Sequence, residues 1–340
     1  MRKGKWLALV LAFVIVGFGF SFFTTSAHAQ IKLNYSNFFP APHKNSILAN
    51  EWAQEIEKRT NGAVKITLFH GGTLTPAAAC YDGVVKGISD IGFSVLSYTL
   101  GRFPLTEVID LPMGYKSGMA ATKLINAYYK KFKPKELDDV KVMYLHAHGP
   151  GILHTNKKPV KTLEDLKGVK IRSTGTVAKI VAALGGTPVA MPMPETYDAL
   201  SKGIAEGVMC PIEALEGWKL GEVLKYTTQN YGSAYTIAFF VVMNKDKWNA
   251  LPPDVQKVIE KVNEEWIDKQ AKVWDEVDVS GMEFTKKRGN KIIPLTKEED
   301  EKWMKAVQPM FDDYVKRMKE KGLPGEEALK FCREELAKLQ

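Results

Sequence analysis

The chain has 340 residues, with 47 basic and 39 acidic side chains and a formal net charge of +8. Its length is sufficient for two hydrophobic cores. The basic excess is mild, and no Arg-rich stripe with interleaved aromatic residues occurs, so the composition argues against a nucleic-acid partner.

The N-terminus has the pattern of a secretory signal peptide. Three basic residues precede an uncharged apolar run over 6–23, and the small residues of an Ala-His-Ala sequence end at Ala29. We expect a signal peptide over 1–29, cleaved after Ala29, and delivery of the remaining chain to the periplasm. An uncleaved membrane anchor is the alternative, because the apolar run approaches spanning length. Cleavage would remove three basic residues and no acidic ones, which lowers the net charge to about +5.

A β-α-β-α-β rhythm follows. Alternating apolar residues indicate strands, and apolar residues three and four apart indicate helices. The expected strands are 31–35, 64–69 and 90–95, and the expected helices are 45–60 and 77–86. This order predicts a mainly parallel sheet flanked by helices, and therefore an α/β fold.

Helices and strands alternate again from 140 onward. The expected strands are 140–145, a run around 152, 169–171, 189–191 and 237–243, with a helix over 195–202.

A long amphipathic helix is expected over 252–284, and its length suits a strut across two lobes. A last strand at 292–295 and two charged helices, separated at 322–325, end the chain.

The cysteines do not form a disulfide framework. Cys80, Cys210 and Cys332 are odd in number and far apart. One disulfide bridge is possible in an oxidising compartment, and the sequence does not indicate which two cysteines would form it.

The chain carries none of the common catalytic motifs. It has no GxSxG, HExxH, CxxC, GxxxxGK[ST] or GxGxxG sequence. His146 and His148 share one face of a strand, but no third ligand lies nearby in the sequence, which favours a core-edge or cleft role over a metal site. We therefore expect no enzyme activity, no cofactor and no metal.

The most informative stretch is 161–211, and its centre is Arg172. Arg172 ends a short strand-like run and is followed by a Thr/Gly-rich turn and an apolar helical segment. A guanidinium at this place can clamp a planar carboxylate with two parallel hydrogen bonds.

Residues 165–172 read Asp-Leu-Lys-Gly-Val-Lys-Ile-Arg, which resembles the DLKGLKIR signature of the DctP-type solute-binding subunits of TRAP transporters. These transporters are tripartite, ATP-independent periplasmic uptake systems. The similarity covers essentially the whole chain after the signal peptide. Further matching segments are 60–62, 87–92, 183–189, 191–192, 195–200, 203–207, 222–226 and 244–252.

The resemblance implies a two-lobe periplasmic binding protein fold, with crossing strands, a long lobe-spanning helix and a cleft that closes on the ligand. We place lobe I at 30–150 plus 236–280 and lobe II at 151–235 plus 281–340. The family's central Arg binds the substrate carboxylate, and this role falls on Arg172. The implied partners are a small organic acid and the small and large membrane permease subunits, and we expect a monomer.

Departures from the family pattern indicate the type of acid. Many members carry a second cation about twenty residues before the central Arg, where this chain has 149–153 without a cation. Cys210 stands where relatives have an Asn, and 74–78 around Ala77 lacks the acid that sialic-acid binders carry. Unpaired polar groups are costly in a dry cleft, so we expect a monocarboxylate with an apolar or aromatic body.

Six aromatic residues are the expected cleft walls, and Trp218 and Tyr235 are the strongest of them because they follow segments that line the cleft in the family. His43 and His154 are expected to donate a hydrogen bond to the ligand or to hold structural roles. The six walls are Phe38, Phe39, Tyr98, Trp218, Tyr235 and Phe239.

Three other functions stay open. The first is the same type of receptor for a small dicarboxylate, hydroxy acid or sulfonate. The second is a periplasmic enzyme on the same scaffold, and the third is a sensory protein that presents its ligand to a membrane receptor.

Overall fold

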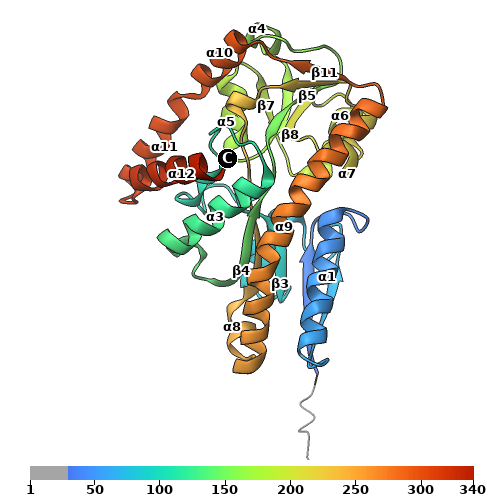
Figure 1. Cartoon of the computed structure of the whole chain (residues 1–340), viewed down its shortest axis with the longest axis vertical. Helices are drawn as coiled ribbons and strands as arrows, with labels where there is room; N and C mark the ends of the chain where they lie inside the picture. The colour runs from blue at the N-terminus through green and yellow to red at the C-terminus, as the bar shows by residue number, and fades with distance from the viewer. Residues whose placement is uncertain (1–29) are drawn as a thin grey trace, which may run out of the picture.

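The structure is a computed structural model that describes residues 30–340, so the predicted signal peptide lies outside the described residues. Two mixed sheets, each flanked by helices, form two α/β lobes joined by a long helix (Figure 1). Within 30–340, no helix has the length and apolar character needed to cross a membrane.

The first lobe contains a five-stranded sheet with the order β2-β1-β3-β10-β4. Strands β1, β2 and β3 are parallel, as the β-α-β rhythm predicts, but β10 lies antiparallel between β3 and β4. The sheet is therefore mixed and not mainly parallel, because β10 returns from the other lobe. The strands are β1 (Ile31–Asn37), β2 (Val64–Phe69), β3 (Ile91–Val95), β4 (Val140–Ala147) and β10 (Ala238–Asn244). The helices of this part are α1 (Lys44–Arg59), α2 (Cys80–Val85), α3 (Gly118–Phe132) and α8 (Lys245–Asn249).

The second lobe contains a six-stranded sheet with the order β11-β9-β5-β8-β6-β7. The strand β5 is antiparallel to both β8 and β9, while β6 runs parallel to β7 and β8. The strands are β5 (Gly151–Thr155), β6 (Lys170–Ser173), β7 (Thr187–Ala190), β8 (Gly207–Pro211), β9 (Tyr226–Gln229) and β11 (Lys291–Pro294). Its helices are α4 (Leu163–Leu166), α5 (Thr176–Ala183), α6 (Thr196–Ser201) and α7 (Ala214–Gly217).

Three segments connect the lobes. The chain crosses between β4 and β5 and again between β9 and β10, and α9 (Pro253–Lys287) runs along both lobes (Figure 1). With 35 residues, α9 is about 50 Å long. In the N-terminal half of α9, the Trp266 indole donates to the Leu48 carbonyl of α1. Near its C-terminal end, Gly281 lies so close to α7 that a Cβ there would be 2.7 Å from the Glu213 Cα. The predicted lobe-spanning helix is therefore present and ends three residues later than expected.

The C-terminal helices divide between the lobes. The helix α10 (Lys297–Val307) lies on the second lobe, where Glu299 accepts the Leu163 backbone N–H at 2.7 Å. The helices α11 (Pro309–Glu320) and α12 (Gly325–Leu339) return to the first lobe: the Tyr314 hydroxyl donates to the Leu105 carbonyl at 2.8 Å, and α12 packs against α3. The expected assignment of all of 281–340 to lobe II therefore differs from the structure over these two helices.

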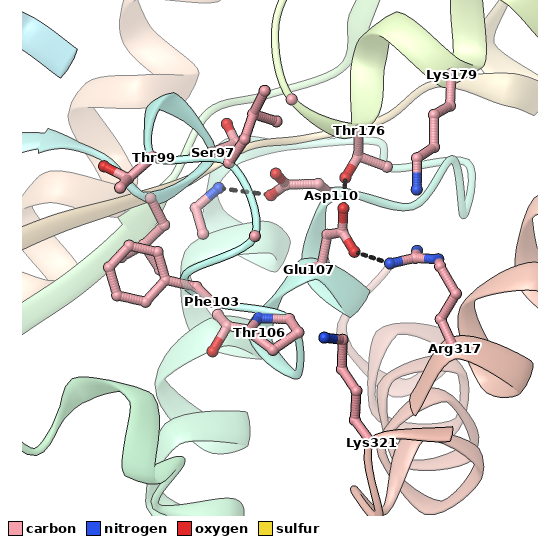
Figure 2. Close-up of a pocket in the computed structure, with 16 residues that line it drawn as sticks. Ser97, Thr99, Phe103, Thr106, Glu107, Asp110, Thr176, Lys179, Arg317 and Lys321 are labelled. Atoms are coloured by element: carbon pink, nitrogen blue, oxygen red, sulfur yellow. Dashed lines mark hydrogen bonds and ion pairs between the residues drawn. The ribbon is translucent and has the colours of Figure 1, made fainter. Parts of the chain in front are cut away.

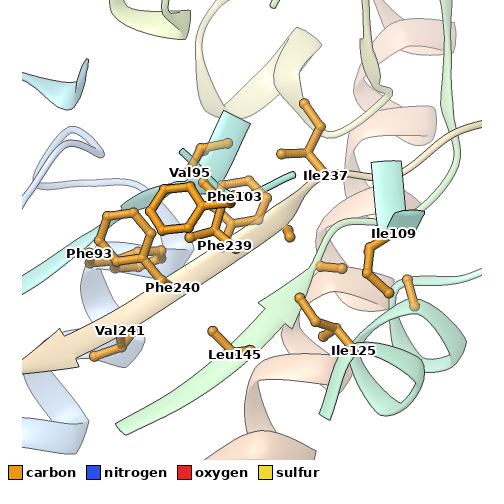
Figure 3. Close-up of a cluster of buried hydrophobic side chains, with 14 of the residues drawn as sticks. Phe93, Val95, Phe103, Ile109, Ile125, Leu145, Ile237, Phe239, Phe240 and Val241 are labelled. Carbon is orange, nitrogen blue, oxygen red and sulfur yellow. The ribbon is translucent and has the colours of Figure 1, made fainter. Parts of the chain in front are cut away.

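The strand β10 positions aromatic side chains on both of its faces (Figure 3). Successive residues of a strand point to opposite faces. Phe240 packs edge-on against Tyr81, with ring centroids 5.4 Å apart, on the core side. Phe239 faces the other way and packs against Trp274 at 5.2 Å. The alternation thus brings one large ring to the boundary between the lobes.

Candidate ligand-binding site

A cavity lies between the lobes, at the carboxyl ends of several strands. Open α/β sheets bind ligands outside these ends. Phe38 follows β1, Tyr98 follows β3, and Thr174 follows β6. Cys210 lies near the end of β8, and Phe239 lies near the start of the antiparallel β10. Both lobes therefore contribute to the same cavity.

Arg172 is a buried cation without a protein counter-ion. Its side chain lines the cavity and the residue is 2% exposed. Its Nε and Nη2 atoms donate to the Met191 carbonyl at 3.1 and 2.8 Å, and no carboxylate among the described residues forms an ion pair with it. Removing a charge from water costs several kcal/mol unless a partner compensates. A carboxylate ligand would supply that partner.

Tyr98 lies close to this cation. Its hydroxyl oxygen accepts the backbone N–H of Met193, a second-lobe residue, at 3.1 Å. Burial raises the pKa of the Tyr98 hydroxyl, and the positive charge of Arg172 acts in the opposite direction. Because the oxygen already accepts one hydrogen bond, its own proton stays available to donate to an anion beside Arg172.

Aromatic side chains from both lobes form the walls. Trp218 of the second lobe stacks on Phe38 of the first, with ring centroids 5.9 Å apart and an interplanar angle of 21°. Phe38 also stacks on Phe239 at 6.4 Å. All six aromatic residues proposed from the sequence line this cavity. Tyr235 presents only its ring, because its hydroxyl donates to the Met209 carbonyl at 2.8 Å.

Cys210 lines the cavity as a neutral thiol. Burial raises its pKa, which disfavours the thiolate. It is not bridged, and Cys80 and Cys332 are also free and buried. No pair of the three cysteines forms the bridge that the sequence left open.

The two histidines proposed as ligand donors do not line the cavity. His154 is bonded within its own lobe through both ring nitrogens, to the Thr227 hydroxyl at 2.9 Å and the Cys210 carbonyl at 3.2 Å. His43 caps α1, where its Nδ1 accepts the Asn45 N–H, so its Nε2 carries the proton and donates to Glu213 at 3.1 Å. His43 therefore contacts the other lobe and not the cavity. Ala77, likewise, is a core residue of the first lobe.

Sequence reasoning missed three polar residues that line the cavity beside Arg172, which are His148, Thr174 and Glu213. The alternating pattern of His146 and His148 suggested a cleft role but could not say which ring reaches the cleft. Glu213 follows the end of β8, and the distance along the chain to its partner His43 is 170 residues. No local pattern reveals a contact of that kind.

A second carboxylate lies beside Glu213. Asp278 of α9 is half-buried, and its Oδ1 accepts the Glu213 backbone N–H at 3.3 Å. Burial raises the pKa of Asp278 well above its ordinary value of 3.8, and the negative charge of Glu213 raises it further. The folded protein therefore binds the Asp278 proton more tightly than the unfolded chain does.

This geometry predicts that Asp278→Asn stabilises the protein at alkaline pH. The folded state holds the Asp278 proton more tightly than the unfolded state, so its stabilising contribution is complete below pH 3.8 and is lost as the pH rises through the raised pKa. The amide keeps the acceptor oxygen and carries no charge. We expect Tm to rise by about 2–4 °C for each 1 kcal/mol recovered, and to rise more at pH 8 than at pH 5. Asp198→Asn changes an exposed side chain and is the control, which should change Tm only slightly, and by the same amount at both pH values. A rise in Tm of Asp278→Asn that is equal at pH 5 and pH 8 would contradict the raised pKa of Asp278.

A larger cavity of about 220 Å³ lies nearby and is less suited to an acid (Figure 2). Its Arg317 is already paired, with Glu107 at 2.7 Å and Asp313 at 2.9 Å. Glu107 and Asp110 both line it, and its other two cations, Lys179 and Lys321, are exposed, so an entering carboxylate would meet two acidic side chains and ammonium groups that water already solvates. The Arg172 cavity is therefore the candidate site. Among residues 30–340, no group of three or more His, Cys, Asp or Glu side chains is placed to hold a metal.

Comparisons with known proteins identify the family. The family model "Bacterial extracellular solute-binding protein, family 7" (DctP) matches residues 36–317. The 2,3-diketo-L-gulonate-binding periplasmic protein YiaO of Escherichia coli is 27% identical over 279 residues, which cover 81% of this chain and 84% of that protein.

Two solved structures are similar over nearly the whole chain. A marine metagenome TRAP solute-binding protein specific for aromatic acid ligands, in complex with metahydroxyphenylacetate, is 29% identical with a TM-score of 0.87 and covers 92% of this chain and 100% of that one. A TRAP solute-binding protein of Rhodoferax ferrireducens with copurified benzoate is 28% identical with a TM-score of 0.86 and covers 91% and 98%.

The family consists of binding proteins and not of enzymes, and its members work with membrane permease subunits. Since the family model spans most of the chain, this protein belongs to the bacterial extracellular solute-binding protein family 7 and is a DctP-type TRAP solute receptor for organic acids.

Proposed function

We propose that this receptor captures an aromatic monocarboxylate between its lobes and delivers it to the small and large permease subunits of its transporter. The observation that carries the proposal is Arg172, a buried cation without a protein counter-ion, facing a cavity with aromatic walls. A bidentate pair with Arg172 would orient the carboxylate, and the rings of Phe38, Trp218 and Phe239 would contact the body of the acid.

The charges around the cavity favour one carboxylate over two. Arg172 is the only Lys or Arg among the lining residues, whereas Glu213 lines the cavity and is 3% exposed. A second carboxylate on the ligand would therefore lack a cation and would lie near an acid. A small dicarboxylate, hydroxy acid or sulfonate remains the alternative ligand of the same receptor.

The described conformation is closed. The cavity has a volume of about 30 Å³, whereas a benzene ring needs on the order of 150 Å³. The stack of Trp218 on Phe38 and the hydrogen bond from Met193 to Tyr98 hold the lobes together at the cavity. A ligand ring would enter by separating these contacts and would then take the place of the Trp218–Phe38 stack.

The N-terminal sequence pattern indicates how the protein reaches its compartment. We propose that the chain is exported, cleaved after Ala29 and released into the periplasm as a monomer. The family's extracytoplasmic role supports this route.

A thermal-shift screen of organic acids tests the proposed ligand class. Ligands that bind only the native state raise Tm by mass action. Phenylacetate or benzoate should raise Tm more than succinate at equal concentration, because only the aromatic acids use the walls. The reverse ranking would reject the aromatic class in favour of a small polar acid. Mass spectrometry of acid retained by the purified protein would identify the ligand directly.

A further inference from the structure

We propose that His148 Nε2 accepts a hydrogen bond from a hydroxyl group of the ligand, so that the receptor selects a hydroxylated aromatic acid over its plain counterpart. The inference rests on the proposed function, because it concerns the same cavity. His148 follows β4 in the crossing segment between the lobes, is 2% exposed and lines the cavity with Arg172.

The protein fixes which ring nitrogen of His148 carries the proton. The His148 Nδ1 atom lies 2.6 Å from the Gly149 carbonyl oxygen. A carbonyl only accepts hydrogen bonds, so Nδ1 must be the donor, and in the neutral ring Nε2 is then an acceptor. Burial lowers the pKa of His148 to about 4, which keeps the ring neutral near pH 7.

This acceptor has no partner among the described residues. His148 Nε2 is buried and makes no hydrogen bond. The rings around it, those of Tyr235, Phe239 and Trp274, lie 5.6 to 6.2 Å away between centroids. Their polar atoms are occupied elsewhere: the Tyr235 hydroxyl donates to Met209, and the Trp274 indole donates to His146. Since none of these groups donates to His148 Nε2, a ligand hydroxyl in the cavity can supply the missing donor.

His146 offers a comparison within the same strand. Its Nε2 is also buried and unpartnered, but His146 does not line the cavity. Its ring stacks on Phe239, with centroids 4.9 Å apart, and its Nδ1 accepts the Trp274 indole N–H at 2.9 Å. Only the ring of His148 is thus placed to read a ligand group.

The chemistry of an acceptor decides the class of ligand. A neutral nitrogen lone pair attracts an O–H group and gains nothing from a carboxylate, a ketone or an ether. A buried polar group left unpaired is costly, so a ligand that supplies the donor is preferred over one that does not. With Arg172 on the carboxylate and aromatic walls on the ring, the favoured ligand is an aromatic acid that carries a hydroxyl on its ring or beside its carboxylate.

Isothermal titration with matched acids tests this inference. The pairs are phenylacetate with 3-hydroxyphenylacetate or mandelate, and benzoate with 3-hydroxybenzoate. At least one hydroxylated member should bind about five- to hundredfold more tightly than its plain counterpart. The fluoro analogue of that member has a similar shape but no donor, and it should bind no more tightly than the plain acid. A wild-type protein that binds plain, fluoro and hydroxylated acids equally well would overturn the inference.

Variants separate His148 from the rest of the site. His148→Phe should reduce the hydroxyl preference to about one while the plain acid still binds; a preference that survives would also overturn the inference. The matched control is His154→Gln, since the ring nitrogens of His154 are bonded within the protein, and it should keep the preference. If His148→Phe does not fold, the fluoro comparison in the wild-type protein decides. Failure of every acid to bind, or plain-acid binding unchanged by Arg172→Ala, would instead reject the proposed function.

Discussion

Arg172→Ala is expected to weaken binding of the carboxylate ligand by a hundredfold or more. Removing one partner of a buried, hydrogen-bonded charge pair costs about 3–5 kcal/mol, and 1.4 kcal/mol corresponds to a factor of ten. The affinity of Arg172→Lys should lie between those of the wild-type protein and the Ala variant, because an ammonium keeps the charge but loses the planar fork. The ligand-induced rise in Tm should disappear in the Ala variant and shrink in the Lys variant.

The same substitution should not destabilise the unliganded protein to a similar degree. The guanidinium is buried without a counter-ion, so its removal also removes a desolvation cost. Arg317→Ala in the neighbouring cavity is the matched control: it breaks the contacts with Glu107 and Asp313 and should lower Tm without changing affinity. If Arg317→Ala lost binding while Arg172→Ala bound normally, the ligand would bind in the neighbouring cavity, and the proposed site would be wrong.

Trp218→Ala is expected to reduce the affinity for an aromatic acid by about ten- to hundredfold. Trp218 is the main wall from the second lobe and stacks on Phe38 of the first. Burying a large aromatic ring contributes roughly 1.5–3 kcal/mol, and an aromatic pair adds about 0.5–1.5 kcal/mol. Trp218→Phe keeps a ring at this place, so its affinity for the aromatic acid should fall much less.

Calorimetry and tryptophan fluorescence measure this effect together. Ligand entry separates Trp218 from Phe38, so the emission of the wild-type protein should change on binding, and Trp218→Phe should remove that change. A small acid without a ring should lose little affinity in Trp218→Ala. If the aromatic acid also lost little, the ring would have to bind elsewhere in the cavity.

Several elements could be predicted from the sequence because their signals are local. The continuous apolar run of β10 and the amphipathic spacing of α9 are local signals, so both elements were expected near their actual bounds. The side of the sheet to which a strand returns is not a local property. For this reason the antiparallel insertion of β10 and the return of α12 to α3 were not predicted.

The site shows the same division. Arg172 was assigned to the site through the family resemblance, and the aromatic walls were proposed from residue type and, for Trp218 and Tyr235, from the same resemblance. The histidines could not be sorted in this way. His43, His148 and His154 differ only in what the folded chain places beside them: Glu213 beside His43, Thr227 beside His154, and no partner beside His148 Nε2.

The sequence by itself determined the family signature and the order of most strands and helices, and it singled out Arg172 as the cation proposed to bind the ligand. The tertiary structure alone decided that Arg172 is buried without a counter-ion, that Glu213 and Asp278 are neighbours, and that His148 lines the cavity with a buried Nε2 that has no partner among the described residues. The physical reason is that burial and hydrogen-bond satisfaction depend on atoms far apart in the chain, which a local pattern does not encode.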